Sequence, residues 1–170
     1  RVALLGRSAG GHLALLAACS TGEAALPPSC ASATPDLSVR AVVSLYAPTD
    51  LRWGYEHPAN ERVLDGPGRI RDFLGGTPAS HSEAFKLASA TSHVNLGTPP
   101  TLLFHGGRDQ LVRDEHMGFL AGRLAQQHIP HRSVLIPYAQ HGFDYNFDGW
   151  GSQIARQFIS QFLAAHLEKR

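Results

Sequence analysis

Cysteine, excess charge and long apolar runs are all scarce in this sequence. The two cysteines, Cys19 and Cys30, are too few for a disulfide framework and lack the spacing of a zinc site, so we expect free thiols, with one local bridge as the alternative. The 15 Lys and Arg residues nearly balance the 14 Asp and Glu residues, which argues against nucleic acid or anionic lipid as a partner. The longest apolar run, Leu13 to Cys19, is far shorter than the roughly 18 to 20 residues of a membrane span.

The remaining composition is that of a globular protein. Hydrophobic residues make up 43% of the chain and charged residues 17%, a balance typical of folded domains and not of disordered tails. A compact body of 170 residues buries roughly 70% of the surface that its unfolded chain exposes. We therefore expect one domain with a substantial core.

Short apolar segments alternate with helical patterns along the chain. Apolar residues recur at helical spacing from about Ser8 to Ser20, from Asp114 to His128 and from Trp150 to Leu167. This alternation predicts an α/β fold of three layers, with helices on both faces of an open parallel sheet. The four segments expected to form its strands are Val2 to Leu5, Val39 to Leu45, Thr101 to His105 and Arg132 to Ile136.

Two stretches lack such regularity. Residues 20–36 contain three prolines among small residues, which indicates a loop. Residues 48–100 combine aromatic residues with many Gly, Pro and His and show no long periodicity. We expect short helices and loops there, forming a cap-like insertion over one end of the sheet within a single domain of residues 1–170.

Ser8 lies in the sequence Gly6-Arg7-Ser8-Ala9-Gly10, between a predicted strand and a predicted helix. A chain that passes directly from strand to helix must bend sharply, and the GxSxG spacing relieves crowding while it exposes the serine hydroxyl. Gly11 would let the helix approach the sheet closely. A phosphate-binding loop fits less well, because neither GxxxxGK[ST] nor GxGxxG is present. Ser8 is therefore a candidate nucleophile.

A serine nucleophile needs a base and a carboxylate that orients the base. Asp109 follows the third predicted strand and His141 follows the fourth. The order Ser, Asp, His is that of α/β-hydrolases. Asp50, after the second predicted strand, is the competing candidate for the acid.

Each candidate also has a purely structural interpretation. Ser8 would then be a serine of a tight turn, Asp109 a helix or turn cap, and His141 an ordinary surface histidine.

Three nearby residues are expected to have structural roles. Asp114 is expected to cap the following helix and His12 to pack under the turn at Ser8. His105 with two following glycines resembles an oxyanion loop, but it leads directly into Asp109, so we do not assign it that role.

Four segments carry a resemblance to a known family: GRSAGGHLAL, SLYAPTDL, PPTLLFHGGRDQLV and AQHGF. From Arg1 to about Leu167 the sequence resembles the C-terminal half of an α/β-hydrolase, closest to the esterase and lipase group that includes feruloyl-esterase-like and hormone-sensitive-lipase-like carboxylesterases. The resemblance implies a partial α/β-hydrolase fold, with Ser8 as nucleophile, Asp109 as acid and His141 as base. It implies no metal and no cofactor.

The expected function is hydrolysis of small-molecule carboxylic esters through an acyl-serine. The backbone N–H of Ala9 is the expected oxyanion donor. The resemblance implies that the second donor loop and four further strands precede Arg1 in a complete enzyme, so that this chain alone would be weakly active or inactive. A peptidase or amidase of the same fold and a non-catalytic hydrolase-derived binding domain are the alternatives.

Overall fold

The computed structural model describes residues 2–27 and 38–167. Cys30 and most of the expected loop of residues 20–36 lie outside these ranges. Cys19 is a free, buried thiol. Burial raises the pKa of Cys19 to about 11, so the thiol stays protonated at neutral pH.

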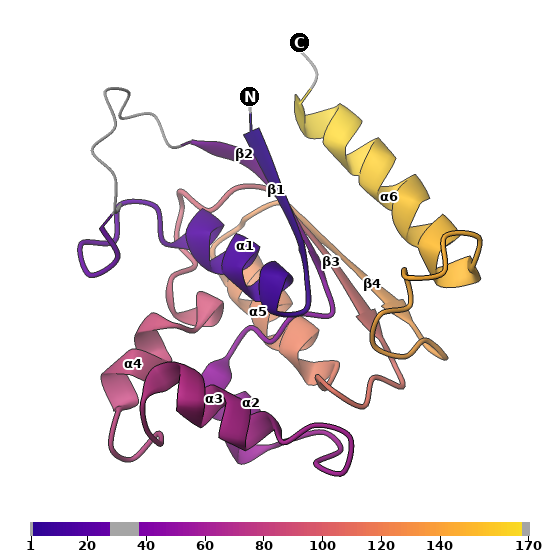
Figure 1. Cartoon of the computed structure of the whole chain (residues 1–170). Helices are drawn as coiled ribbons and strands as arrows, with labels where there is room; N and C mark the ends of the chain where they lie inside the picture. Colours follow the sequence, from indigo (N-terminus) through magenta and orange to yellow (C-terminus); the bar gives the residue numbers. More distant parts are fainter. Residues whose placement is uncertain (1, 28–37, 168–170) are drawn as a thin grey trace.

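Four parallel strands form one sheet in the order β1-β2-β3-β4 (Figure 1). The order in the sheet is the order in the chain. Because neighbouring strands are parallel, each connection between them crosses over a face of the sheet, and the carboxyl ends of all four strands lie at the same edge. This confirms the four predicted strands, with boundaries shifted by at most two residues. The strands are β1 (Val2–Arg7), β2 (Val39–Leu45), β3 (Thr101–Gly106) and β4 (His131–Ile136).

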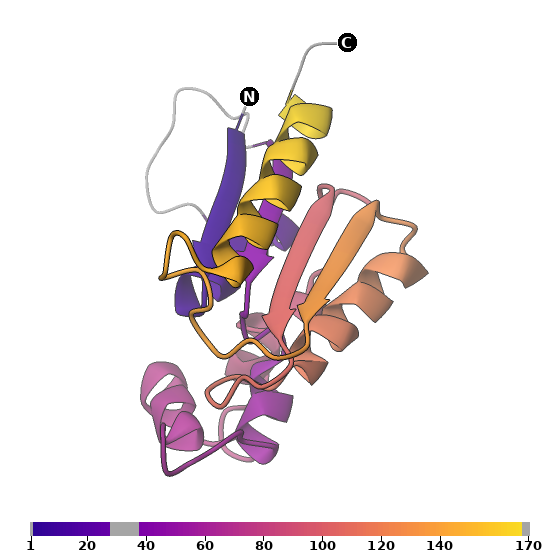
Figure 2. The same ribbon diagram turned by 90° about the vertical axis from the view of Figure 1, so that its right-hand side faces the viewer.

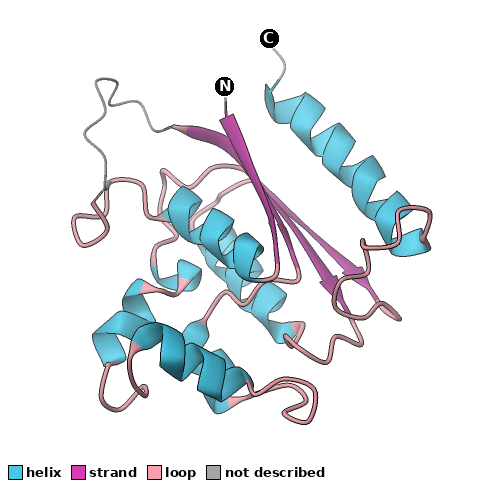
Figure 3. Cartoon of the chain, in the orientation of Figure 1, coloured by secondary structure: helices cyan, strands magenta, loops and turns pink. Residues whose placement is uncertain are grey.

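Helices cover both faces of this sheet, as the three-layer prediction requires (Figures 2 and 3). The helices α1 (Ala9–Cys19) and α5 (Glu115–Gln126) pack on one face, and α6 (Trp150–Leu167) packs on the other. Successive side chains of a strand point to opposite faces. Along β2, Val42 accordingly joins the core under α1 and α5, whereas Val43 joins the core under α6.

Short helices follow β2 and lie beyond the carboxyl-terminal ends of the strands (Figures 1 and 2). Leu51 and Phe85 are buried in a small core of their own among these helices. Asp50 caps the first of them by accepting a hydrogen bond from the backbone N–H of Trp53 at 2.9 Å. The elements are α2 (Leu51–Glu56), α3 (Gly66–Leu74), α4 (Ser82–Leu87) and the 3₁₀ helix η1 (Ala90–Ser92).

Leu15 offers a test of the core between α1 and the sheet. Its side chain is fully buried, whereas Leu13 on the same helix is 58% exposed. We expect Leu15→Ala to lower the free energy of unfolding by about 2 to 5 kcal/mol, because it removes buried methyl groups and leaves a cavity. Leu13→Ala, the matched control, should change it by less than about 0.5 kcal/mol. Urea unfolding measures both, and equal losses in the two variants would contradict this packing.

Candidate active site

Ser8 occupies the turn between β1 and α1 with a strained backbone. Its φ of 51° lies in the left-handed region that non-glycine residues rarely adopt. The N–H of Ser8 donates to the carbonyl of Leu45 at 2.9 Å, which ties the turn to the neighbouring strand. A Cβ at Gly6 would overlap the backbone of Gly10, so this position requires glycine. The turn has the geometry expected of a strand-to-helix elbow.

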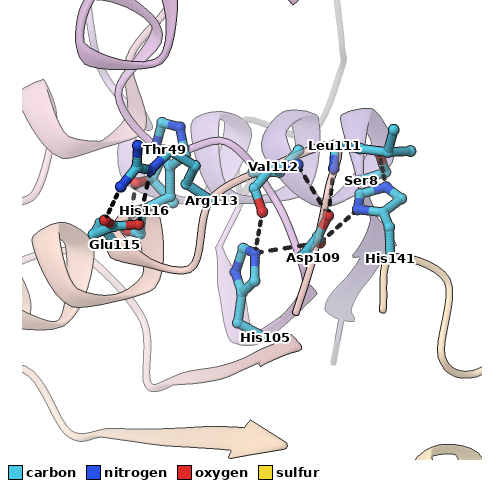
Figure 4. A network of polar contacts seen from close by, with 10 residues as sticks. All are labelled: Ser8, Thr49, His105, Asp109, Leu111, Val112, Arg113, Glu115, His116 and His141. Atoms are coloured by element: carbon cyan, nitrogen blue, oxygen red, sulfur yellow. Dashed lines mark hydrogen bonds and ion pairs between the residues drawn. The ribbon is translucent and has the colours of Figure 1, made fainter. Parts of the chain in front are cut away.

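His141 lies between Ser8 and Asp109 (Figure 4). Its Nε2 atom is 2.9 Å from the Ser8 hydroxyl oxygen, and its Nδ1 atom is 2.7 Å from Asp109 Oδ2. An ionised carboxylate only accepts hydrogen bonds, so Nδ1 carries a hydrogen and donates a hydrogen bond to Asp109. Nε2 of the neutral ring is then free to accept the hydroxyl proton of Ser8. The structure thus brings together three residues that follow β1, β3 and β4.

The side chain of Asp109 is fully buried, and its two carboxylate oxygens have different partners. Oδ1 accepts hydrogen bonds from the backbone N–H groups of Leu111 at 2.8 Å and Val112 at 3.0 Å. Oδ2 faces His141 and lies 3.4 Å from Nε2 of the buried His105. Both sequence interpretations of Asp109 therefore describe part of its surroundings, because one oxygen caps a turn while the other contacts the imidazole.

The charge of Asp109 is set by opposing effects. Burial alone would raise the pKa of this carboxyl, but hydrogen bonds from His105, His141 and the backbone bring the pKa well below its ordinary value. Asp109 is therefore ionised at neutral pH. His105, which also contacts the carbonyl of Val112 at 2.9 Å, belongs to this carboxylate's surroundings and not to an oxyanion loop.

The other sequence candidates have different partners or positions from those of the His141 contacts. Asp50 caps α2 and accepts a hydrogen bond from the Thr91 hydroxyl at 3.3 Å. Asp114 occupies the predicted N-cap position of α5, but its side chain makes no capping hydrogen bond. The prediction was therefore right about the position of Asp114 and wrong about its hydrogen bond. His12 is buried and donates from Nε2 to the carbonyl of Ala88 at 2.7 Å, a structural role as expected.

An apolar cavity of about 310 Å³ opens beside Ser8. The segment between β2 and β3 supplies most of its wall, and Ser8, α1, the turn after Asp109 and the start of α5 supply the rest. Apolar side chains dominate the lining, among them Leu13, Leu51, Ile70, Phe73 and Leu111. The hydroxyl of Ser8 therefore lies at the wall of a space suited to an apolar group.

Neither a metal site nor a membrane span is found in the part of the chain that the structure describes. No group of three or more His, Cys, Asp or Glu side chains there is placed to hold a metal ion. None of the helices within residues 2–27 and 38–167 is long and apolar enough to cross a bilayer.

His116 lines the same cavity and was not identified from the sequence. The ring is buried, and its Nδ1 accepts hydrogen bonds from the backbone N–H groups of Thr49 at 3.3 Å and Asp50 at 3.4 Å. Burial, and next the nearby His105, lower the pKa of His116 to about 4. Nothing in the local sequence distinguishes it from the other histidines, because its role comes from contacts with the chain after β2.

The lowered pKa of His116 predicts a loss of stability in mild acid. The unfolded chain takes up the proton more readily than the folded one, so this contribution is complete above about pH 6.5 and falls as the pH approaches 4. We expect His116→Gln to reduce the pH dependence of the unfolding free energy in this window by up to about 3 kcal/mol.

Urea unfolding at a series of pH values measures this effect. His81→Gln, at an exposed position, is the control and should keep the wild-type dependence. Part of the loss should persist in His116→Gln, because burial also lowers the pKa of His12. An unchanged slope in His116→Gln would show that His116 is not held neutral by the fold.

Known proteins match this chain over most of its length. Residues 1–124 match the BD-FAE family. Esterase LipC of Mycobacterium tuberculosis is 33% identical over 169 residues, which are 95% of this chain and 39% of LipC. Esterase LipQ of the same organism is 30% identical over 170 residues, covering 99% of this chain and 39% of LipQ. The chain thus spans about 39% of the length of these curated relatives.

A solved structure of an esterase has the same fold. Thermogutta terrifontis esterase 2 phosphonylated by sarin superposes with a TM-score of 0.72 at 26% identity, over 96% of this chain and 56% of that chain. Another structure of that esterase holds butyrate. By the family match and this fold, the chain belongs to the BD-FAE family of α/β-hydrolases.

Proposed function

We propose that this chain carries the nucleophile, base and acid of a serine hydrolase that cleaves carboxylic esters. The observation that supports the proposal most strongly is the pair of contacts of His141, at 2.9 Å to the Ser8 hydroxyl and 2.7 Å to Asp109. A surface histidine has no reason to lie at hydrogen-bonding distance from both a strained serine and a buried carboxylate. The ester as substrate is supported by LipC and LipQ, which are esterases.

The reaction begins with proton transfer from Ser8 to Nε2 of His141. The Ser8 oxygen attacks the ester carbonyl carbon, and Asp109 stabilises the imidazolium that forms. The tetrahedral intermediate collapses when His141 returns the proton to the alcohol oxygen, which breaks the ester bond and leaves an acyl-serine. Water, deprotonated by His141, then attacks the acyl group and releases the acid and the free serine.

Ala9 contributes a donor for the negative oxygen of the intermediate. The helix α1 begins at Ala9, and the first N–H groups of a helix have no partner within it. The N–H of the residue after the nucleophile is therefore available to the oxyanion. We assign a second donor to a segment of the longer relatives, as the sequence resemblance implies.

The apolar cavity beside Ser8 receives the acyl part of the substrate. Its lining offers contact to hydrocarbon and few polar groups, so short and medium acyl chains are better substrates than charged ones. The butyrate bound in Thermogutta terrifontis esterase 2 supports a small acyl group.

Ser8→Ala tests the nucleophile. We expect a fluorophosphonate probe to label the wild-type chain slowly and to leave Ser8→Ala unlabelled, because the alanine has no oxygen to phosphonylate. Ser80→Ala, at an exposed serine that hydrogen-bonds to Thr77 and His81, is the matched control and should label like the wild type. Intact-mass measurement and peptide mapping locate the adduct. Equal labelling of Ser8→Ala and wild type would refute the assignment.

The 170 residues alone should be poor catalysts. Removal of one oxyanion donor typically costs 10² to 10³ in rate, and only the Ala9 donor is assigned to this chain. We expect turnover of p-nitrophenyl butyrate by the purified chain to be about 10² to 10³ times slower than by Thermogutta terrifontis esterase 2. Equal turnover rates for the two proteins would contradict the prediction that the 170 residues alone are poor catalysts. Faster cleavage of an aminoacyl-proline amide than of the ester would favour a peptidase.

A further inference from the structure

A second residue with a strained backbone lies beside the proposed nucleophile. Tyr46, directly after β2, has a φ of 43°, and left-handed values are outliers for bulky residues. Its N–H donates to the carbonyl of Phe104 at 2.7 Å. Because Arg7 and Leu45 are paired in the sheet, Ser8 and Tyr46 follow paired residues on adjacent strands. Such strain persists only where the surrounding structure imposes it, and it concentrates at functional sites.

The ring of Tyr46 packs against the imidazole of His141. The ring centroids are 4.4 Å apart and the planes are tilted by 59°. Tyr46 also makes an edge contact with Phe143, at 5.2 Å between centroids, and is fully buried. The imidazole is therefore held from two directions, by Asp109 through a hydrogen bond and by Tyr46 through ring contact.

The hydroxyl of Tyr46 anchors the chain segment that carries His141. It donates to Asp144 Oδ1 at 2.5 Å, and Asp144 Oδ2 accepts from Arg7 at 3.2 Å. Burial, and next the hydrogen bond to Asp144, raise the pKa of Tyr46 far above its ordinary value, so the hydroxyl keeps its proton. The carbonyl of Asp144 also accepts from the Ser152 hydroxyl at 2.9 Å, which joins the segment to α6.

These contacts connect three segments at one point. Arg7 immediately precedes Ser8, Tyr46 directly follows the neighbouring strand β2, and Asp144 lies three residues after His141. The His141 segment is an irregular loop between β4 and α6, and no strand or helix fixes the direction of its imidazole. The contacts of Tyr46 link this loop to the residue that follows β2.

We propose that Tyr46 is a positioning residue that, through its ring contact with His141 and its hydrogen bond to Asp144, holds the imidazole toward Ser8. Its effect on reaction rate rests on the proposed function, whereas its effect on the imidazole does not. Tyr46 does not line the cavity beside Ser8, and its ring contacts are with His141 and Phe143, so it acts through His141.

Fluorophosphonate labelling of the whole chain tests the effect on rate. We expect Tyr46→Phe to lower the maximal labelling rate about tenfold, with the probe concentration for half-maximal rate unchanged, because probe binding does not involve Tyr46. Tyr55→Phe makes the same change in the small core of the helices after β2, where Tyr55 packs on Phe85, and should label like the wild type. Loss of stability alone would not separate the two labelling parameters in this way.

Nuclear magnetic resonance of the same variants tests the imidazole directly. With ¹⁵N-labelled histidine, the Nδ1 proton of His141 is identified by its loss in His141→Gln. We expect this proton to exchange with water about tenfold faster in Tyr46→Phe than in the wild type or Tyr55→Phe, because the ring is held less firmly against Asp109.

The two measurements separate the possible failures. If the wild type is never labelled but Tyr46→Phe accelerates the proton exchange, the proposed function fails and the positioning role stands. If Tyr46→Phe keeps both the wild-type labelling rate and the wild-type exchange, the positioning role is overturned.

Asp144→Asn keeps the test valid if Tyr46→Phe does not fold, as judged by circular dichroism. It should show the same changes, since it weakens the same hydrogen bond. Where both single variants fold, the double variant should be no slower than either one. Additive effects would mean that Tyr46 does not act through Asp144.

Discussion

The abrupt passage from β1 into α1 governs the geometry of the whole site. Ser8 accepts a left-handed backbone there, and α1 starts at once behind it. The passage is possible because a side chain is missing at Gly6, where a Cβ would overlap Gly10, and at Gly11, where a Cβ would crowd Ser44 and Ala47. The hydrogen bond from Ser8 to Leu45 then fixes the turn against β2. Every other group of the site is placed relative to this turn.

The parallel sheet brings the remaining groups to the same edge. Because all four strands run in one direction, the residues that follow them are neighbours in space although they are far apart in the chain. Asp109 follows β3, His141 follows β4 and Tyr46 follows β2. The interior strands β2 and β3 are the most deeply buried, so Tyr46 and Asp109 both follow strands that the core holds on both faces.

Local patterns were sufficient to predict the strands and the main helices. They also singled out Ser8, Asp109 and His141, and the structure brings Ser8 and Asp109 to hydrogen-bonding distance of His141. Short, mainly apolar segments mark the strands, and the glycines around Ser8 mark the turn, because each signal lies within a few residues. Three features were not predictable in this way: the different partners of the two Asp109 oxygens, the neutral state of His116 and the contacts of Tyr46 with His141 and Asp144. They depend on partners such as His105, Thr49 and Asp144, which only the folded chain brings near. Asp114 shows the limit of a local pattern. Aspartate is a favoured residue at a helix N-cap, but the side chain of Asp114 makes no capping hydrogen bond.

The two separately engaged oxygens of Asp109 have a consequence for its isosteric replacement. An asparagine in the same pose keeps its carbonyl on the N–H groups of Leu111 and Val112, so the turn survives. Its amide nitrogen then faces His141 as a donor, and the imidazole must answer with the other tautomer, which bears its hydrogen on the side of Ser8. The Ser8 hydroxyl would then face a hydrogen-bond donor on His141 in place of the acceptor that the native tautomer offers. Exchange of one atom thus reverses the direction of the hydrogen bond between His141 and Ser8 while the architecture stays intact.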